Sequence, residues 1–521
     1  MVAALRQETG LLAERRVTHV AAGLAALWTL LLLVPSPTTA RALGPHLIFL
    51  DTAGFGALFA VALVLVERAE RTDAVRRVSP LRPAEAALCR ILPLTLLTCA
   101  MATPIALAAA RPADAAGALR VALTAPVAVA PVAVLLLACC LAAGTRARTL
   151  PGVVTGALPL LAPLLVVPVA HLLGVLDHPI AHAVPTTAGA RLIEASVTGL
   201  PPAGGALPAL LWAWLWAAIA VGVAARALGG PPPASSRFPR HRPGAARPAA
   251  GRRAGRGTGG RITALLGLAG PFRDPLPWLL IPAPLLTALA LRPLWPAAVD
   301  LFADRYAIDL APHAPTVFAA LILLHVPILI GTVIALRWVE DAEEGLPRLV
   351  RVAPVPAPLP LLLWLAVAWG LSLLVQAVAI PLSGLAPTAG PESLVAALLA
   401  ASLAPLVVAV VAATAGNRVE ALVATKTAGA LSVGVPVAAA LLPAPAGAAL
   451  ALLPPAWPLL VLAGETGNAG GATAFPALAD LVERVPLSAA IVVPMGVLAG
   501  LLLCVPPARR ALSRSLAPSP G

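Results

Sequence analysis

Long and nearly uncharged apolar runs recur along the chain, and they constrain its fold more than any other feature. A helix needs roughly 20 predominantly apolar residues to cross a bilayer core about 30 Å thick. About twelve runs approach or reach this length, which predicts about twelve transmembrane helices. They lie at residues 17–34, 47–66, 88–109, 121–144, 153–173 and 207–228, and at residues 276–294, 317–337, 359–382, 394–415, 428–442 and 487–505.

The composition argues against a soluble globular fold and against a disordered chain. Hydrophobic residues make up 60% of the 521 residues and charged residues only 11%, whereas soluble domains carry about 25% charged residues. The chain has too little polar surface for a soluble globule of this size, and it is too hydrophobic to be disordered. We therefore predict an all-α, multi-pass protein embedded in the lipid bilayer of the cell membrane.

Loop charges predict the orientation of these helices. If the N-terminus lies inside, the loops on that side carry most of the arginines, including those of residues 67–83 and 337–351. The opposite loops carry acidic residues such as Asp177, Glu194 and Asp480. Cationic loops are retained in the cytoplasm, so both termini are predicted to be cytoplasmic.

A change in composition divides the chain near its middle. Residues 229–260 are rich in Arg, Pro and Gly and contain no acidic residue. Such a tract cannot bury a core, so it predicts a cytoplasmic linker that also touches anionic lipid. The linker separates a first six-helix half, residues 1–228, from a second six-helix half, residues 261–521.

A short pattern recurs at the inner end of the second span of each half. Residues 66–70 read VERAE and are followed by RVSP at 77–80, while residues 339–343 read VEDAE and are followed by RVAP at 351–354. The offset is 273 residues for the first match (339 − 66) and 274 for the second (351 − 77). Because six spans is an even number, the halves are predicted to be parallel repeats related by an axis along the membrane normal.

The two matching inner loops are the candidate functional elements. Spacings of three and four residues place their acidic side chains near one face of a short helix, and following prolines end that helix. One interpretation is a solvated loop that obeys the positive-inside rule, and the sharper one is a docking element for a cytoplasmic partner. The candidate contact residues are Glu67, Glu70, Arg76 and Arg77 in the first loop and Glu340, Glu343, Glu344, Arg348 and Arg351 in the second.

These loops resemble the inner loop of ABC-2-type transporter permeases. The resemblance rests on ERAERT at 67–72 with RVSPLRP at 77–83, and on EDAEEG at 340–345 with RVAPV at 351–355. The segment NRVE with Lys426, expected between the tenth and eleventh spans, also fits. Together they are similar to the actinobacterial fluoroquinolone-export permease group, here with two six-span permeases fused. The first loop departs from the family pattern at Thr72 and Asp73, and Leu346 and Pro347 predict a bent or shorter helix in the second.

The resemblance implies an export permease for lipophilic drugs or lipid-like molecules, with a separate ABC ATPase homodimer docked on the two loops. ATP-driven closure of the ATPase would then switch access to the pathway. The sequence agrees with this division, because Lys426 is the only lysine and no phosphate-binding GxxxxGK[ST] loop exists. We expect no catalytic residue and no cofactor in this chain. A nucleic-acid partner is not expected, because one Tyr and eight Phe offer few stacking platforms.

Two other functional classes stay open. A proton-coupled secondary transporter needs ionisable groups inside the membrane, and Asp51 with His325 forms a possible pair at matching depths of the two halves. A membrane-embedded enzyme would need a catalytic constellation. His178 and His182 have helical i, i+4 spacing, but Pro179 and the missing Glu argue against a metalloprotease motif, and no metal site is expected.

Overall fold

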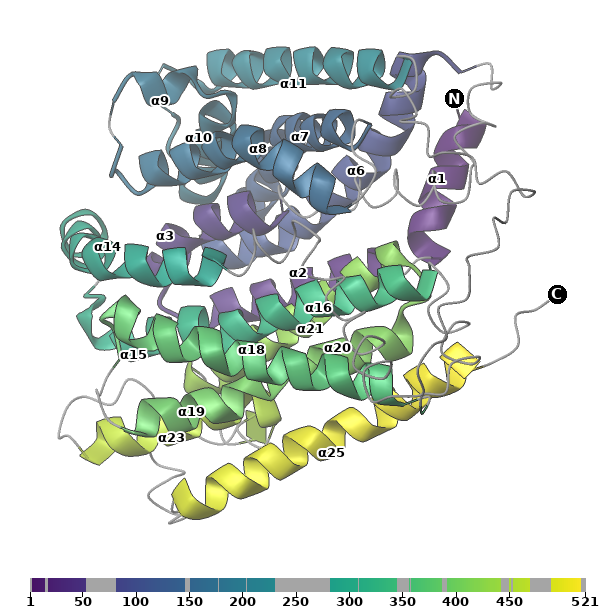
Figure 1. Cartoon of the computed structure of the whole chain (residues 1–521). Coiled ribbons are helices and arrows are strands. Elements are labelled where there is room, and N and C mark those ends of the chain that lie inside the picture. Colours follow the sequence, from purple (N-terminus) through teal and green to yellow (C-terminus); the bar gives the residue numbers. More distant parts are fainter. Residues whose placement is uncertain are drawn as a thin grey trace, which may run out of the picture.

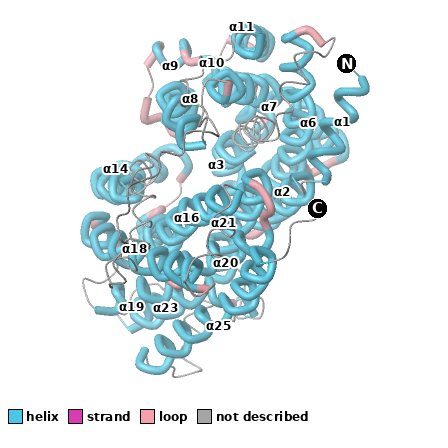
Figure 2. Tube along the Cα trace, turned by 45° about the vertical axis from the view of Figure 1, so that its right-hand side comes forward, coloured by secondary structure: helices cyan, strands magenta, loops and turns pink. Residues whose placement is uncertain are grey.

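In the part of the chain that the computed structural model describes, every element of regular secondary structure is a helix (Figure 1, Figure 2). This confirms the predicted all-α fold. The described residues are 2–14, 17–52, 81–145, 150–176, 178–202, 204–229, 282–307, 309–343, 356, 358–386, 391–441, 449–450, 453–468 and 489–516.

The first half begins with a short helix and continues through long apolar helices. Ser36 caps α3 by accepting a hydrogen bond from the Thr39 backbone N–H (3.2 Å), and Asp114 caps α7 by accepting one from the Gly117 N–H (2.9 Å). The elements are α1 (Val2–Glu14), α2 (Val17–Leu33), α3 (Pro37–Leu47), the π-helical η1 (Ile48–Thr52), α6 (Pro83–Ala110), α7 (Ala115–Gly144), α8 (Leu150–Leu172), α9 (Ile180–Ala183), α10 (Pro185–Thr198) and α11 (Ala206–Gly229).

The second half repeats this mixture of long and broken helices. Its second apolar run is built from a short helix, a π-helical stretch and a longer helix in direct succession. The elements are α14 (Pro282–Tyr306), η4 (Ala311–His313), α15 (Ala314–Phe318), the π-helical η5 (Ala319–Leu324), α16 (His325–Glu343), α18 (Leu359–Ser383), α19 (Pro391–Ala401), α20 (Leu403–Thr414), α21 (Arg418–Leu441), η6 (Pro454–Ala456), α23 (Trp457–Asn468) and α25 (Ala489–Leu516).

Within the described segments, seven helices are long and apolar enough to cross a membrane, or eight if α1 and α2 form one bent span. The chain is therefore a multi-pass membrane protein, and the count of twelve remains a prediction. The predicted second span, 47–66, is described only as far as Thr52, and the predicted linker only at Gly229. The helix axes run roughly side by side, with α1 and the C-terminal end of α25 at the same edge of the molecule (Figure 1).

Helix α11 shows how these helices use the bilayer as their solvent. Its large side chains lie on the surface, whereas its small side chains are buried against α6 and α7. This is the arrangement expected where lipid takes the place of water and close helix packing supplies the stability. The exposed face carries Leu207, Leu211, Leu215, Ile219 and Val223, and the buried face carries Ala213, Ala217, Ala220 and Ala224.

Neighbouring helices recur in the same chain order in both halves. In the first half α2 packs against α6, α6 against α7, and α7 against both α10 and α11. In the second half α14 packs against α18, α18 against α20, α20 against α25, and α19 against α23.

The two halves are joined by a shared core. Val17, Ala21 and Leu24 of α2 belong to the same buried cluster as Ile330 of α16 and Val407 of α20. Figure 1 shows α2 beside α21, and the two helices are in direct contact. The N-terminal helices therefore complete a wall of the second half.

The predicted start of the eleventh span at residue 428 is wrong, because α21 begins ten residues earlier, at Arg418 (428 − 418). Asn417 Oδ1 accepts hydrogen bonds from the backbone N–H groups of Val419 and Glu420, both at 3.0 Å. Such a cap starts a helix in a segment too polar for hydropathy to detect. Lys426, predicted in a loop, consequently lies within the helix.

Helices α16 and α20 approach so closely that only glycine fits at one position. A Cβ atom added to Gly331 would lie 2.7 Å from the Ala404 carbonyl oxygen and 3.0 Å from the Ala404 Cα atom. Both are backbone atoms and cannot rotate away. Gly370 in α18 is a glycine inside a helix where an added Cβ would meet nothing within 4 Å, so it serves as a control.

We expect Gly331→Ala to lower the free energy of unfolding by about 1–3 kcal/mol, because α16 must move away from α20. Gly370→Ala should leave it unchanged or raise it slightly, since alanine favours a helix over glycine. Thermal unfolding of the detergent-purified proteins measures both. Equal melting temperatures for the two variants would contradict the close approach.

Candidate functional site

The inner end of α16 carries a dense set of charged side chains. Arg337 Nη1 lies 3.2 Å from Glu340 Oε2, and Arg337 Nη2 lies 2.8 Å from Asp341 Oδ1. These are i, i+3 and i, i+4 pairs on one helix face, as the spacing in the sequence predicts. The side chains of Glu340 and Asp341 are only 8% and 16% exposed, so the pairs are partly desolvated.

Arg418, the first residue of α21, joins this set from another helix. Its Nε lies 2.8 Å from Glu343 Oε2, and its Nη1 lies 3.4 Å from Glu340 Oε1. Its backbone N–H also donates a hydrogen bond to Glu343 Oε1 at 3.0 Å. We call Arg337, Glu340, Asp341, Glu343 and Arg418 the inner corner, because they tie the end of α16 to the start of α21.

The start of α21 is held in place by a second set of hydrogen bonds. Glu420 Oε2 accepts from the Gly416 backbone N–H at 2.7 Å, and Glu420 Oε1 accepts from the Asn417 side-chain N–H at 3.0 Å. Together with the Asn417 cap, these bonds stiffen the turn between α20 and α21. The first residues of α21 are therefore bonded both to the turn before them and, through Arg418, to the end of α16.

Only part of the predicted loop residues falls within the described structure. Glu340 and Glu343 lie in the inner corner, where Glu340 is buried and faces Arg418 rather than solvent. Their predicted role in partner contact stays a prediction. The other candidates lie outside the described residues: Glu67, Glu70, Arg76, Arg77, Glu344, Arg348 and Arg351.

The sequence analysis did not select Arg418 or Glu420 as site residues. A signal was present, because the α16 end carries three acidic side chains, Glu340, Asp341 and Glu343, but only one cation, Arg337. A partly buried excess of negative charge requires a cation from elsewhere. Nothing in the sequence identifies which of the many arginines supplies it.

Asp51 and His325 both lie at π-helical stretches. Asp51 is within η1, and His325 follows η5 directly as the first residue of α16. The His325 side chain is exposed on the surface of the described structure, and the predicted pairing with Asp51 stays a prediction. π-Helical segments in membrane helices are often found at functional positions. The buried Gln376 side chain of α18 donates to the Leu323 carbonyl at 2.8 Å, and so satisfies a backbone group of η5.

A cavity of about 860 Å³ lies between the two halves of the chain. Helices α1 and α2 of the first half form one wall, and α20, α21 and η6 of the second half form the other. We call it the inter-half pocket. It is lined by Glu14, His19, Val20, Leu406, Val407, Val410, Thr414, Gly416, Glu420, Val423, Ala424, Thr427, Ala428, Leu431 and Pro455.

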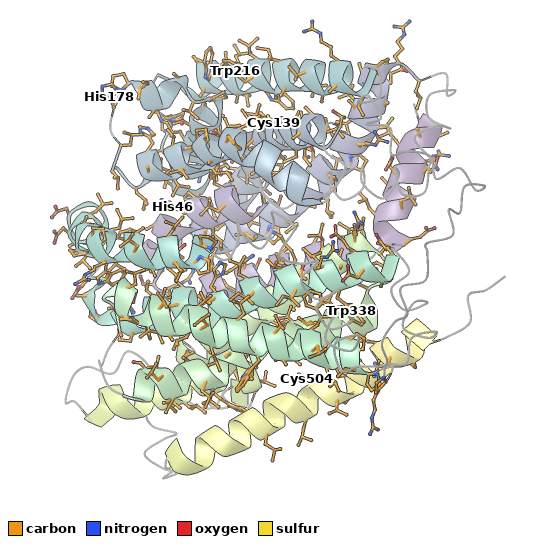
Figure 3. The ribbon with its side chains drawn as sticks, viewed as in Figure 1. His46, Cys139, His178, Trp216, Trp338 and Cys504 are labelled. Atoms are coloured by element: carbon orange, nitrogen blue, oxygen red, sulfur yellow. The ribbon has the colours of Figure 1, made fainter. Side chains whose placement is uncertain are left out.

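The histidines of the segment before α11 lie at the opposite end of the molecule from the inner corner. Figure 3 places His178 at the left-hand edge, with Trp338 of α16 toward the right. The ring of His182 packs edge-on against His171, with 4.9 Å between the ring centroids. No group of three or more His, Cys, Asp or Glu side chains in the described segments could hold a metal ion.

The helical architecture defines the chain as a multi-pass protein of the cell membrane, and part of its sequence is similar to that of transport permeases. Residues 268–491 match the family described as "Fluoroquinolones export permease protein Rv2686c-like". This match confirms the resemblance to the fluoroquinolone-export permease group for the second inner loop, whereas the first inner loop, residues 67–83, lies outside the matched residues.

Two curated relatives carry the same description. They are the fluoroquinolones export permease proteins MT2760 and Rv2686c of Mycobacterium tuberculosis, from strains CDC 1551 / Oshkosh and ATCC 25618 / H37Rv. Each is 27% identical over 191 residues, which cover 36% of this chain and 76% of the relative. The family match at residues 268–491 contains both α16 and α21, and hence all five residues of the inner corner.

We expect Arg418→Ala to destabilise the protein by about 3 kcal/mol, because it leaves the buried Glu340 carboxylate without its cross-helix partner. Arg226→Ala provides the control, since Arg226 is an exposed arginine near the end of α11 and should cost less than about 0.5 kcal/mol. A double-mutant cycle with Glu343→Ala, read from thermal unfolding, measures the pairwise coupling. Additive effects of Arg418→Ala and Glu343→Ala would show that the two side chains do not interact.

Proposed function

We propose that this chain is the membrane permease of an ATP-driven exporter, energised by a separate cytoplasmic ABC ATPase. The ATPase, a homodimer, docks on the inner loops that follow the second span of each half, around residues 67–83 and 340–355. The observation that carries the proposal is the inner corner, because it connects one of these loops to a helix of the inter-half pocket.

The connection gives a physical route for coupling. Glu343 lies at the last residue of α16, where the loop begins, and it holds the first residue of α21 through an ion pair and a backbone hydrogen bond. Further along α21, Glu420, Val423 and Leu431 line the pocket. A push on the loop would therefore tilt or shift a pocket wall, which is the kind of rigid-element motion by which transporters alternate access.

A separate ATPase is supported by the lysine content. A phosphate-binding loop needs a lysine directly after a glycine, in a loop before a helix. Lys426 follows Thr425 and lies inside α21, and the sequence has no other lysine. ATP hydrolysis is accordingly assigned to the partner, and the permease holds neither a catalytic residue nor a cofactor.

The fusion of two halves supports a homodimeric ATPase. The inner loops share a sequence pattern, and the helix neighbours recur in the same order in both halves. Two related loops offer two related docking positions, as two identical ATPase domains require. The proposal therefore includes that residues 1–228 and 261–521 are two related halves, each with one docking loop.

The relatives' name suggests the class of substrate. A fluoroquinolone or another lipophilic, drug-sized molecule is exported through a pathway built mainly from apolar helices. A proton-coupled transporter is the alternative, and it differs in its energy source. Transport that stops when the proton gradient is removed, while ATP is intact, would rule out the ATP-driven mechanism.

Uptake of a fluorescent fluoroquinolone into inverted membrane vesicles tests the energy source and the docking loops together. The vesicles come from cells that express the chain with its ATPase partner. We expect uptake to require ATP, to persist with a protonophore, and to fall by about tenfold or more in the double variant Glu67→Arg, Glu344→Arg, because like charges at an interface cost several kcal/mol.

The control is Asp304→Arg, which reverses a charge at an exposed position of α14 near the predicted outer surface. It should leave uptake unchanged at equal expression. Glu340 is left intact in both variants, because its burial in the inner corner would confuse loss of docking with loss of stability. Full ATP-dependent uptake and full co-purification of the ATPase with the double variant would refute docking at these loops.

A further inference from the structure

The inter-half pocket has the size of a site for a drug-like molecule. Ligand pockets typically enclose about 300–1,000 Å³ and are mainly apolar with a few polar groups. The inter-half pocket measures about 860 Å³, and its walls are formed mostly by valine, leucine and alanine side chains. Neither half encloses it alone, because α1 and α2 face α20 and α21 across it.

The polar groups of the pocket gather toward one end. Glu14 and His19 flank the junction of α1 and α2, while Glu420 and Gly416 lie at the junction of α20 and α21. The Glu420 carboxylate accepts two hydrogen bonds, from the Gly416 backbone N–H and from the Asn417 side-chain N–H, and both donors are uncharged. None of the described residues that line the pocket is an arginine or a lysine.

The apolar part of the pocket extends from this charged end along α21. The lining residues run from Glu420 to Leu431, eleven positions or about 16 Å at 1.5 Å per residue. Three residues beyond Leu431, α21 packs closely against α2, because a Cβ atom on Gly434 would lie 2.9 Å from Leu27 Cδ2 of α2. The pocket is thus acidic at the end near the inner corner and apolar farther along α21.

We propose that the inter-half pocket binds a lipophilic cation, with the positive group between Glu14 and Glu420 and the apolar body against Val20, Val410 and Val423. A compact cation is attracted by the two carboxylates, and the described lining residues include no arginine or lysine. An anion of the same shape meets the same apolar wall but is repelled at the acidic end. The proposal rests on the proposed function, and it names the substrate class and the binding site of that transport.

The test uses two ions of nearly equal shape and opposite charge, tetraphenylphosphonium and tetraphenylborate. Binding of radiolabelled tetraphenylphosphonium to the full chain in lipid nanodiscs is measured without ATP and without the ATPase, and empty nanodiscs give the background. We expect saturable binding of the cation, whereas radiolabelled tetraphenylborate, measured in a separate sample, should show no saturable binding above that of empty nanodiscs. Saturable binding of the two ions with equal affinity would overturn the assignment of a cation.

Variants of the two walls locate the site. Val20→Trp fills the pocket from the first half and Val410→Trp fills it from the second, so each should reduce binding more than about tenfold. Glu14→Gln and Glu420→Gln keep the shape and should each weaken binding up to about fivefold. The control Val223→Trp adds the same bulk to the exposed face of α11, and it should bind as the parent protein does.

These experiments test the binding pocket independently of the energy source of transport. Unchanged binding in Val20→Trp and Val410→Trp, with both proteins monodisperse and thermally stable, would overturn the pocket even if ATP-driven export persists. A phospholipid that co-purifies, is lost in these variants and is not displaced by tetraphenylphosphonium would overturn it as well. Cation binding that is lost as expected, in a protein without ATP-driven transport, would support the pocket and refute the proposed energy source.

Discussion

Close helix packing through small residues is the constraint on which the rest of this structure depends. Lipid offers no hydrophobic drive for helices to associate, so they are held by van der Waals contact at short range. Gly331 lets α16 reach the backbone of α20, Gly434 lets α21 reach Leu27 of α2, and the alanine face of α11 packs against α7. The contact at Gly434 positions α21, which forms a wall of the inter-half pocket. The contact of α11 with α7 belongs to the core of the first half.

Charge is used where packing alone cannot define position. Among the described residues, Arg90 and Glu340 are the charged residues that are buried, and the inner corner surrounds Glu340 with partly buried charged side chains at the end of α16. Partly buried ion pairs of this kind contribute little net stability but fix geometry, because breaking one partner leaves an expensive charge behind. Arg418 thereby sets the position of α21 relative to α16, and α21 in turn lines the pocket that α1 and α2 complete.

Several features could be predicted from the sequence because they depend on local pattern. Apolar runs predict helices at nearly every expected position, and the family match agrees with the inner-loop motifs. The start of α21 was missed because Asn417 and Glu420 cap the helix with polar groups, whereas hydropathy detects only its apolar part. The burial of Glu340 was missed because a charged loop end normally points to water.

The sequence by itself determined that this protein is helical, spans the membrane several times and carries no phosphate-binding loop. Length, hydropathy and residue type decide these properties, and none depends on which helices touch. Only the tertiary structure decided that Arg418 pairs with Glu343, 75 residues away, and that α2 faces α21 across a pocket. Lipid-facing and buried apolar side chains have the same hydropathy, so the choice of neighbours depends on shape and on the few places where charges meet.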